Sequence, residues 1–260
     1  MLDGEYNRFS RAAGLRRMDE RIEVAGYRAR KEPKSLFAKG MVETGENVNS
    51  AQKPQRVLAT EENIKAFSDA MEAVGYKVEG FSDHEIDVRS LVEMHKAYGK
   101  MAEIYPDVAN GLKLVYDDGA PDDFGWYNPH KRSIHLNSRM YRDYAETEKT
   151  YAELVETGHF PKGTDLRGGF YHEFGHAWRY QHGPRSYRKE IDSILYDMGY
   201  GRLSVWNREK AIKTELSVYA VVDTNPSYQE VIAEVFSEWY NSDEPREFCE
   251  RFMKEVLLNV

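Results

Sequence analysis

The sequence predicts an α+β fold, with a small antiparallel sheet, a helix that carries a candidate active site, and a C-terminal helical lobe. Three features predict this class. Apolar residues recur at helical spacing through most of the chain after residue 59. Segments around 112–116 and 126–137 instead have the short, turn-bounded pattern of strands. After residue 207 every apolar stripe is helical, so the strands precede a helical lobe.

The first 58 residues differ in composition from the rest. The stretch 7–34 is rich in charged residues and poor in large apolar ones, and 43–54 is polar without periodicity. Such composition is typical of a solvated segment rather than a packed core. The full length of 260 residues allows one large domain with an appendage. We therefore expect an extended or partly helical arm or linker at 1–58 and one folded domain at 59–260.

Two helices are expected at the start of this domain. The first, closed by Gly75, has apolar residues at helical spacing: Ile64, Phe67, Met71 and Val74. Ser82 followed by Glu85 has the spacing of a capping box, which predicts that the second helix begins there. Pro106 ends it, because proline cannot donate the next backbone hydrogen bond.

Strands and further helices follow. A strand is expected at 112–116, and a β-hairpin at 126–137, where a polar turn separates two arms and the second arm alternates. The remaining helices are expected at about 141–157, 164–181, 207–222, 226–241 and 245–257. For the helix at 164–181, Thr164 and Asp165 suit the N-cap and the first turn.

The composition argues against several classes of protein. A net charge of −8 and the lack of a basic, aromatic-rich patch argue against nucleic acid as a partner. Cys249 is the only cysteine, so no intrachain disulfide can form. No apolar stretch reaches the length of a membrane span, and no N-terminal apolar run resembles a signal peptide. We expect synthesis in the cytoplasm, with later association with a virion or delivery by a non-Sec route left open.

The stretch His172-Glu173-Phe174-Gly175-His176 carries the strongest functional signal. On a helix, His172 and His176 lie about 40° apart on one face, so that both imidazoles can bind one metal ion. Glu173 lies one position further round, where it can take a proton from a metal-bound water. The opposite side of the helix carries apolar residues: Phe170, Phe174, Ala177 and Trp178. The alternative is that these are two ordinary histidines of a surface or core helix.

A catalytic zinc site usually has three protein ligands, and the sequence offers two candidates for the third. His182 has the spacing of the last histidine in the metzincin pattern HExxHxxGxxH, and the stretch 197–200 faintly resembles a Met-turn. However, Arg179 stands where that pattern has a helix-breaking glycine. If the helix continues to Gly183, His182 lies about 9 Å further along the axis and away from the ligand face.

Glu230 is the other candidate. Asn225 and Pro226 suit the N-cap and first position of its helix. Glu230 and Glu234 lie one turn apart and away from the predicted buried stripe: Val231, Ile232, Val235, Phe236 and Trp239. Packed beside the motif helix, this helix would complete a His-His-Glu site. The alternative is a solvated row of glutamates that also includes Glu238.

Together, the two motifs resemble a known family. The stretch 172–176 and the run Glu230-Val231-Ile232-Ala233-Glu234, preceded by Tyr219-Ala220 and Asn225-Pro226, are similar to the signatures of gluzincins related to the catalytic domain of anthrax lethal factor. Related peptidase domains occur in phage-encoded and bacterial proteins. The resemblance covers about 82–257 and implies a zincin-like metallopeptidase domain.

The resemblance also implies roles for individual residues. One Zn²⁺ would be bound by His172, His176 and Glu230, with Glu173 as general base. Glu234 would orient a ligand without binding the metal.

Tyr219 is the best match to the tyrosine that stabilises the oxyanion in the family. It precedes Glu230 by eleven residues, a longer gap than the family pattern has. The segment 134–137 resembles the edge strand of such clefts, so we expect a protein or peptide substrate to bind as an added strand near Ile134.

The implied function is that of a zinc-dependent endopeptidase. The alternatives are a metzincin-like peptidase that uses His182, and a phage- or virion-associated interaction protein with a structural metal site.

Overall fold

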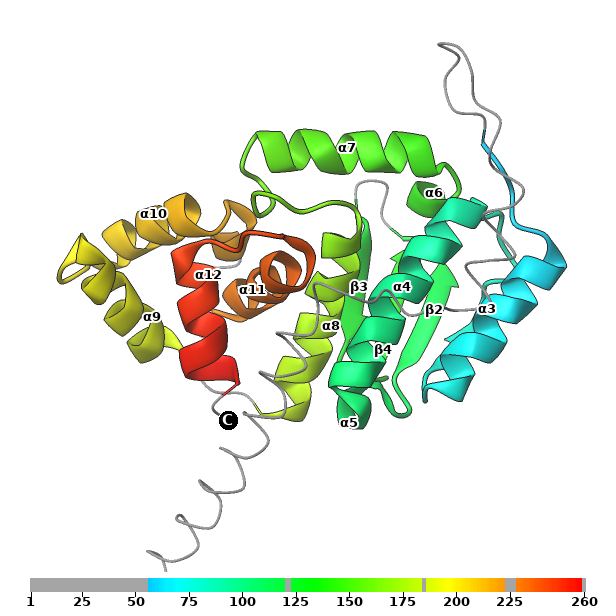
Figure 1. Ribbon diagram of the computed structural model, residues 1–260, viewed down its shortest axis with the longest axis horizontal. Helices are drawn as coiled ribbons and strands as arrows, with labels where there is room; N and C mark the ends of the chain where they lie inside the picture. The colour runs from blue at the N-terminus through cyan, green and yellow to red at the C-terminus, as the bar shows by residue number, and fades with distance from the viewer. Residues whose placement is uncertain (1–55, 120–122, 184–185, 223–227, 259–260) are drawn as a thin grey trace, which may run out of the picture.

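The computed structural model describes residues 56–119, 123–183, 186–222 and 228–258, and its elements are labelled in Figure 1. Most of the predicted arm at 1–58 therefore lies outside the described residues. Its last three residues lie against the domain: Leu58 forms an isolated bridge with Asp87, and the carbonyl of Val57 accepts a hydrogen bond from the amide of Val88.

The sheet has four strands in the order β1 (Lys77–Glu79), β2 (Lys113–Asp117), β4 (Ser133–Asn137) and β3 (Gly125–Asn128). β1, β2 and β4 run parallel, and only β3 is antiparallel to its neighbour. The α+β class is confirmed, but the prediction of an antiparallel sheet is wrong. A helical crossover separates β1 from β2, and such a connection lets consecutive strands run in the same direction.

The predicted hairpin is present, as β3 and β4, but its arms are placed differently from the prediction. β4 pairs with β2 on one side and β3 on the other, and all five of its residues are buried. The edge strands of the sheet are therefore β1 and β3, and the prediction of an edge strand at Ile134 is wrong. Alternation within a hairpin does not reveal which arm meets the rest of the sheet.

Helices cover one face of the sheet, where the side chains of Leu114, Tyr116, Ile134 and Leu136 are fully buried. α3 (Glu61–Ala73) and α4 (Val88–Ile104) lie over the strands, and α8 (Arg167–Gln181) lies beside β3 (Figure 1). Thr60 caps α3 through a capping box with Asn63.

The predicted capping box at Ser82 and Glu85 is wrong, because α4 begins after Asp87. The Asp87 carboxylate accepts a hydrogen bond from the amide of Arg89 at 3.0 Å. It also binds the Arg89 guanidinium. One short helix, α5 (Pro106–Ala109), then leads from α4 to β2.

Between β4 and α8 lie two helices, α6 (Ser138–Tyr141) and α7 (Tyr144–Glu156), where one was predicted. The C-terminal lobe contains α9 (Arg188–Leu195), the wide turn η2 (Tyr196–Tyr200), α10 (Val205–Glu215), the 3₁₀ turn η3 (Tyr219–Val221), α11 (Gln229–Asn241), α12 (Glu247–Phe252) and η4 (Met253–Leu257).

The helix predicted at 207–222 ends at Glu215, and Tyr219 lies on η3 instead. α11 is the helix predicted at 226–241; its expected caps, Asn225 and Pro226, lie outside the described residues. The helix predicted at 245–257 corresponds to α12 and η4 together.

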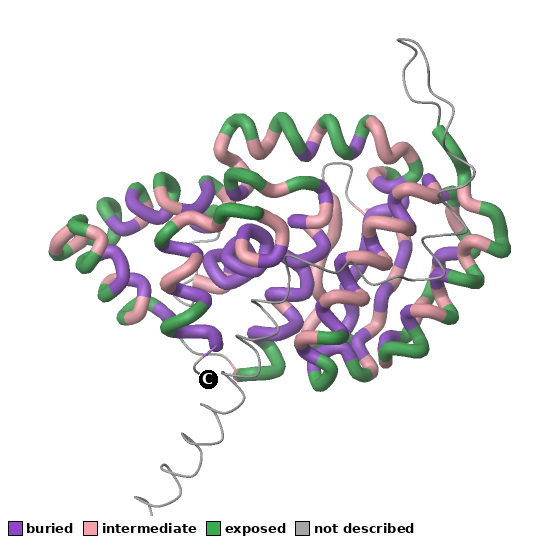
Figure 2. The backbone as a smooth tube through the Cα atoms, viewed as in Figure 1, coloured by how far each residue is buried: buried purple, intermediate pink, exposed green. Residues whose placement is uncertain are grey.

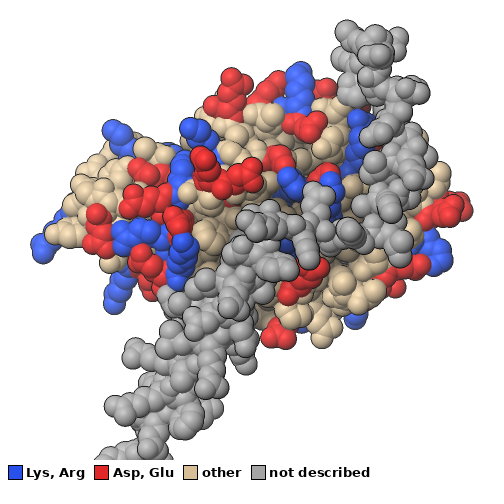
Figure 3. Space-filling view, in the orientation of Figure 1, with Lys and Arg blue, Asp and Glu red and all other residues tan. Residues whose placement is uncertain are grey.

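Burial is concentrated where α8 meets α11 and where α4 meets the sheet (Figure 2). The outer sides of α3, α7 and α10 are largely exposed. On the face seen in Figure 3, acidic and basic side chains of the described residues are interspersed rather than gathered by sign. None of the described helices is both long enough and apolar enough to cross a membrane.

Candidate metal centre

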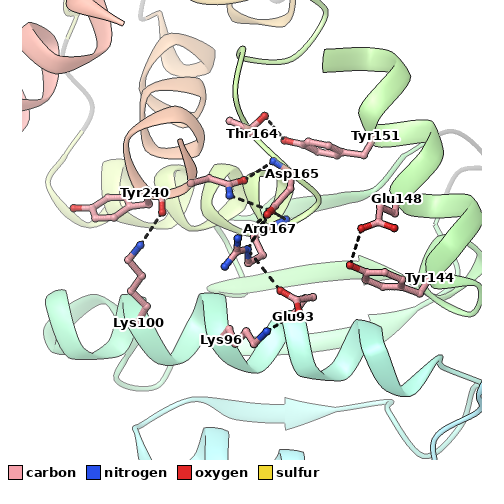
Figure 4. A network of polar contacts seen from close by, with 11 residues as sticks. Glu93, Lys96, Lys100, Tyr144, Glu148, Tyr151, Thr164, Asp165, Arg167 and Tyr240 are labelled. Carbon is pink, nitrogen blue, oxygen red and sulfur yellow. Dashed lines mark hydrogen bonds and ion pairs between the residues drawn. The ribbon is translucent and has the colours of Figure 1, made fainter. Parts of the chain in front are cut away.

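The motif helix α8 begins at Arg167. With Thr164 as N-cap it would have begun two residues earlier, at Asp165. The hydroxyl of Thr164 donates to the carbonyl of Pro161 instead of capping the helix. Asp165 accepts a hydrogen bond from the amide of Arg167 and binds its guanidinium, which also lies near Glu93 of α4 (Figure 4). These contacts attach the start of the motif helix to the layer of helices that covers the sheet.

The two sides of α8 are used as predicted. Its apolar side is buried in the core through Phe170, Phe174, Ala177 and Trp178. His172 and His176 lie on the other side, with their ring centroids 4.8 Å apart. The helix ends at Gln181, and Gly183 follows with a positive φ of 86°.

Gly175, inside the motif, lets α11 approach α8 closely. A Cβ atom there would lie 2.9 Å from Ala233 Cα and 3.0 Å from Phe236 Cβ. Since real Cβ atoms do not come this close to a neighbouring backbone, any side chain at this position would push the helices apart. The approach brings Glu230 and Glu234 within reach of the two imidazoles.

Three donor atoms converge from these two helices. His172 Nε2 lies 3.1 Å from His176 Nε2, and Glu230 Oε2 lies 3.4 Å from each of these nitrogens. Ligands about 2.0–2.1 Å from a tetrahedral zinc ion are about 3.3–3.4 Å from one another. The residues present therefore fit a metal ion of this size, and Glu230 Oε2 is buried without a well-formed hydrogen bond.

The charges of the centre also favour a cation. Glu173, Glu230 and Glu234 are all at least nine-tenths buried within one small region. Contact with the two imidazoles outweighs the effect of burial on Glu230 and holds its pKa far below the usual value. Buried carboxylates are costly unless they are paired or bind a metal ion. His172, His176 and Glu230 could therefore hold a metal ion.

Glu234 contacts His172 from the side opposite the candidate metal position. Its Oε1 lies 2.7 Å from His172 Nδ1, and its Oε2 accepts a hydrogen bond of 2.6 Å from the hydroxyl of Ser217. With a proton on Nδ1, the lone pair of His172 Nε2 is directed toward His176 and Glu230. Burial alone would lower the pKa of His172, but Glu230 and Glu234 together raise it well above the usual value.

Sequence patterns gave no indication of Ser217, because a single serine between two helices has no characteristic spacing. Its hydroxyl oxygen also accepts a hydrogen bond of 3.1 Å from the amide of Ala220. Ser217 thus joins the η3 turn to Glu234.

Glu173 lies on the sheet side of the histidines. Its Oε2 is buried without a hydrogen-bond partner, and burial raises the pKa of this carboxyl, an effect that His172 and His176 partly oppose. The strand β3 passes close by: a Cβ atom on Gly125 would lie 3.6 Å from Glu173 Cγ. A carboxylate so placed can accept and return a proton at the metal centre.

Tyr219 lies against the same centre from η3. Its ring packs edge-on against the ring of His172, with centroids 5.4 Å apart, and also contacts His159 and Phe160. Burial, followed by the nearby charges of Glu230 and Glu173, raises the pKa of the Tyr219 hydroxyl well above its usual value. The hydroxyl therefore keeps its proton and can donate a hydrogen bond.

His182 lies apart from this group. Its ring stacks on Trp178 at 4.1 Å between centroids, and its Nδ1 is 2.8 Å from the carbonyl of Trp178. Since α8 is not broken at Arg179, the chain does not turn back toward the metal position. Met198, of the predicted Met-turn, lies in η2 and packs against the core of the lobe.

A cavity of about 530 Å³ opens beside His172 and Glu173. It lies between α7, α8 and β3, and Tyr219 and Glu234 line it as well. Its volume is within the range of about 300–1,000 Å³ that is usual for ligand sites.

Comparisons of the chain with protein-family models, with curated proteins and with solved structures found no match. The resemblance to gluzincins rests on the residues of the two motifs alone.

Proposed function

We propose that this chain is a zinc-dependent endopeptidase with a gluzincin-like, zincin-type centre. The observation that carries the proposal is the convergence of His172 Nε2, His176 Nε2 and Glu230 Oε2 at distances of 3.1 and 3.4 Å. Two neutral nitrogens and one carboxylate oxygen are a common donor set for a catalytic zinc ion. Glu173, with a buried oxygen that lacks a partner, adjoins this group.

In this proposal each residue has one task. Bound zinc would supply a Lewis acid and a water of lowered pKa. Glu173 takes the proton from that water and later gives it to the leaving amine, for which a raised pKa is suited. Tyr219 donates a hydrogen bond to the oxygen that becomes negative during the attack. Glu234 holds His172 in the tautomer that leaves Nε2 free.

The substrate is proposed to bind along β3. This strand pairs with β4 alone among the described strands, so its outer edge is open to an added strand. Gly125 lies where β3 passes Glu173, and a Cβ atom there would lie 2.6 Å from the carbonyl oxygen of His135, so glycine lets β3 pack closely against β4. An extended peptide on this edge would have one side chain directed toward the cavity.

The proposal is tested with a peptide-library cleavage assay on the zinc-loaded protein. Glu173→Gln keeps the shape of the side chain but cannot act as a base, so cleavage should fall by about 10²–10⁴-fold at unchanged zinc content. Removal of zinc with a chelator should abolish cleavage, and returned zinc should restore it. Full activity of the Glu173→Gln protein would contradict the mechanism.

A further inference from the structure

The end of the helical lobe that lies away from the sheet exposes several large hydrophobic side chains. The exposed fraction is 58% for Tyr196, 37% for Tyr200, 54% for Val205 and 75% for Trp206. These four residues, here called the tip residues, lie on η2 and on the first turn of α10 (Figure 1, yellow). Exposed hydrophobic residues are common singly, but four within eleven residues of the chain indicate an interaction site.

The core of the lobe does not depend on the tip residues. The buried sides of α9 and α10 are formed by other residues: Ile191, Ile194, Leu195, Ala211 and Ile212. Between the two helices the chain turns at Gly199 and Gly201, whose positive φ values of 92° and 69° glycine adopts at little cost. Replacement of a tip residue should therefore leave the lobe folded.

Exposed basic side chains accompany Trp206. Lys210 and Lys213 follow it at positions i+4 and i+7, so the three side chains lie along one side of α10. Arg202 is exposed in the turn that precedes this helix. Among the described residues, none of these three basic groups has a carboxylate within the distance of an ion pair.

Most carboxylates of the same region are engaged within the protein. Asp192 binds Arg208, Asp197 binds Arg251 at 2.9 Å, and Glu215 accepts a hydrogen bond from Tyr200. On the outer side of α10 and in the preceding turn, the free basic groups are opposed by one half-exposed carboxylate, that of Glu209. This end of the lobe thus presents a positive charge next to aromatic rings.

This combination favours a lipid surface as the partner. Tryptophan and tyrosine rings concentrate where a bilayer meets water, and lysine and arginine at that depth attract anionic headgroups. Interfaces between proteins also use tryptophan and tyrosine, but they are depleted in lysine. The net charge of −8 does not oppose the contact, because carboxylates further away than a Debye length of about 8 Å are screened at physiological salt.

We propose that the tip of the helical lobe docks on a membrane surface that carries anionic lipids. Trp206, Val205 and Tyr196 enter the headgroup region, while the basic side chains contact lipid phosphates: Arg202, Lys210 and Lys213. The contact is peripheral and uses no residue of the candidate metal centre. It therefore holds whether or not the chain is a peptidase.

Sedimentation of the full-length protein with lipid vesicles measures this binding. The vesicles consist of phosphatidylcholine, either alone or with one quarter phosphatidylglycerol. We expect binding to the anionic vesicles that weakens as salt is raised, with much weaker binding to phosphatidylcholine alone. Trp206→Ala should weaken binding about tenfold or more, because a large apolar ring no longer leaves water. Lys210→Ala should weaken it about fivefold.

A fluorescence measurement reports the position of the ring itself. On binding to the anionic vesicles, tryptophan emission should shift to shorter wavelength, and this shift should be absent in Trp206→Ala. The matched controls are Tyr180→Ala and Lys149→Ala. Tyr180 is 43% exposed on α8, and Lys149 is exposed on α7, so neither substitution should change vesicle binding.

Three results with vesicles would overturn the proposal: no binding to the anionic vesicles, equal binding to both kinds of vesicle, or binding that survives Trp206→Ala. Sedimentation velocity without lipid examines the other occupant of such a surface, a second copy of the chain. A dimer that Trp206→Ala dissociates would assign the tip residues to self-association and overturn the proposal as well.

Discussion

At the scale of single residues, the candidate centre depends on a chain of hydrogen bonds that extends beyond the metal-binding residues. The amide of Ala220 donates to Ser217, Ser217 donates to Glu234, and Glu234 accepts from His172. Glu234 is 1% exposed, so these two donors take the place of water around its charge. Ser217 is therefore expected to influence metal binding without contacting the metal.

Replacement of Ser217 by alanine tests this influence. Without its donor, Glu234 holds His172 less firmly. Because Ser217 acts through Glu234, the affinity for zinc should fall by up to about tenfold, less than the roughly 10–100-fold typical of a residue that contacts a metal ligand directly. Ser217→Thr keeps the hydroxyl and should restore the affinity. Competition with a chromophoric chelator measures it, and equal zinc affinity in all three proteins would contradict the role.

The choice between Glu230 and Glu234 as ligand is tested at the same scale. Glu230→Ala removes one of three donor atoms and should lower zinc affinity more than Glu234→Ala, whose effect should be about 10–100-fold. Circular dichroism should show that both variants stay folded, because each change leaves α11 in place. A larger loss of zinc in Glu234→Ala would reverse the assignment.

At the scale of elements, the centre is formed by the close approach of α8 and α11, and Gly175 permits it. Gly175→Ala should force the helices apart, with a cost of about 1–3 kcal/mol in the free energy of unfolding, and should weaken zinc binding. Gly169→Ala on the same helix is the control. Its Cβ would be 3.7 Å from Tyr151, an ordinary contact.

Alanine at Gly169 should therefore leave stability unchanged or raise it by up to about 1 kcal/mol, because alanine is the better helix former. Urea unfolding of both variants measures the difference. If the two substitutions had equal effects, the close contact at Gly175 would not be what limits the packing.

The pattern of each helix predicted its buried side but not its ends. Apolar spacing identified the apolar sides of α8 and α11, since burial of an amphipathic helix follows its period. The opposite side of α11 is buried as well, including Glu230, Glu234 and Glu238. The predicted caps at Ser82 and Thr164 were wrong because other groups compete for them. Asp87 caps α4 by accepting from the amide of Arg89, and Thr164 gives its hydroxyl proton to a nearby carbonyl.

At the scale of the whole molecule, the order and direction of the strands could not be predicted. β1 has three residues and no distinctive pattern, and the pairing of β4 with β2 joins residues about twenty positions apart. Strand patterns report which side chains are buried, whereas parallel pairing depends on how the connecting helices pack. The meeting of His172, His176 and Glu230, in contrast, could be anticipated, because each of these residues lies opposite the apolar stripe of its helix.

Zinc should stabilise the folded protein as a whole, because a ligand that binds only the native state adds to its stability. At a free zinc concentration of 1,000 times the dissociation constant the gain is about 4 kcal/mol. For a domain of this size, each kcal/mol raises the melting temperature by about 2–4 °C. We therefore expect an increase of about 8–16 °C on addition of zinc, measured by differential scanning fluorimetry.

The increase in melting temperature on addition of zinc should become larger as pH rises. In the metal-free protein the pKa of His172 is raised, so protonated His172 stabilises the folded state. This stabilisation is complete below the unfolded pKa of about 6.5. It is lost as pH rises through the folded pKa. Zinc needs the unprotonated imidazole, so binding displaces that proton. The melting temperature difference between zinc-loaded and metal-free protein should thus be small at pH 6 and should grow as pH rises through the folded pKa. A difference that shrinks over that interval would mean that His172 does not bind the metal.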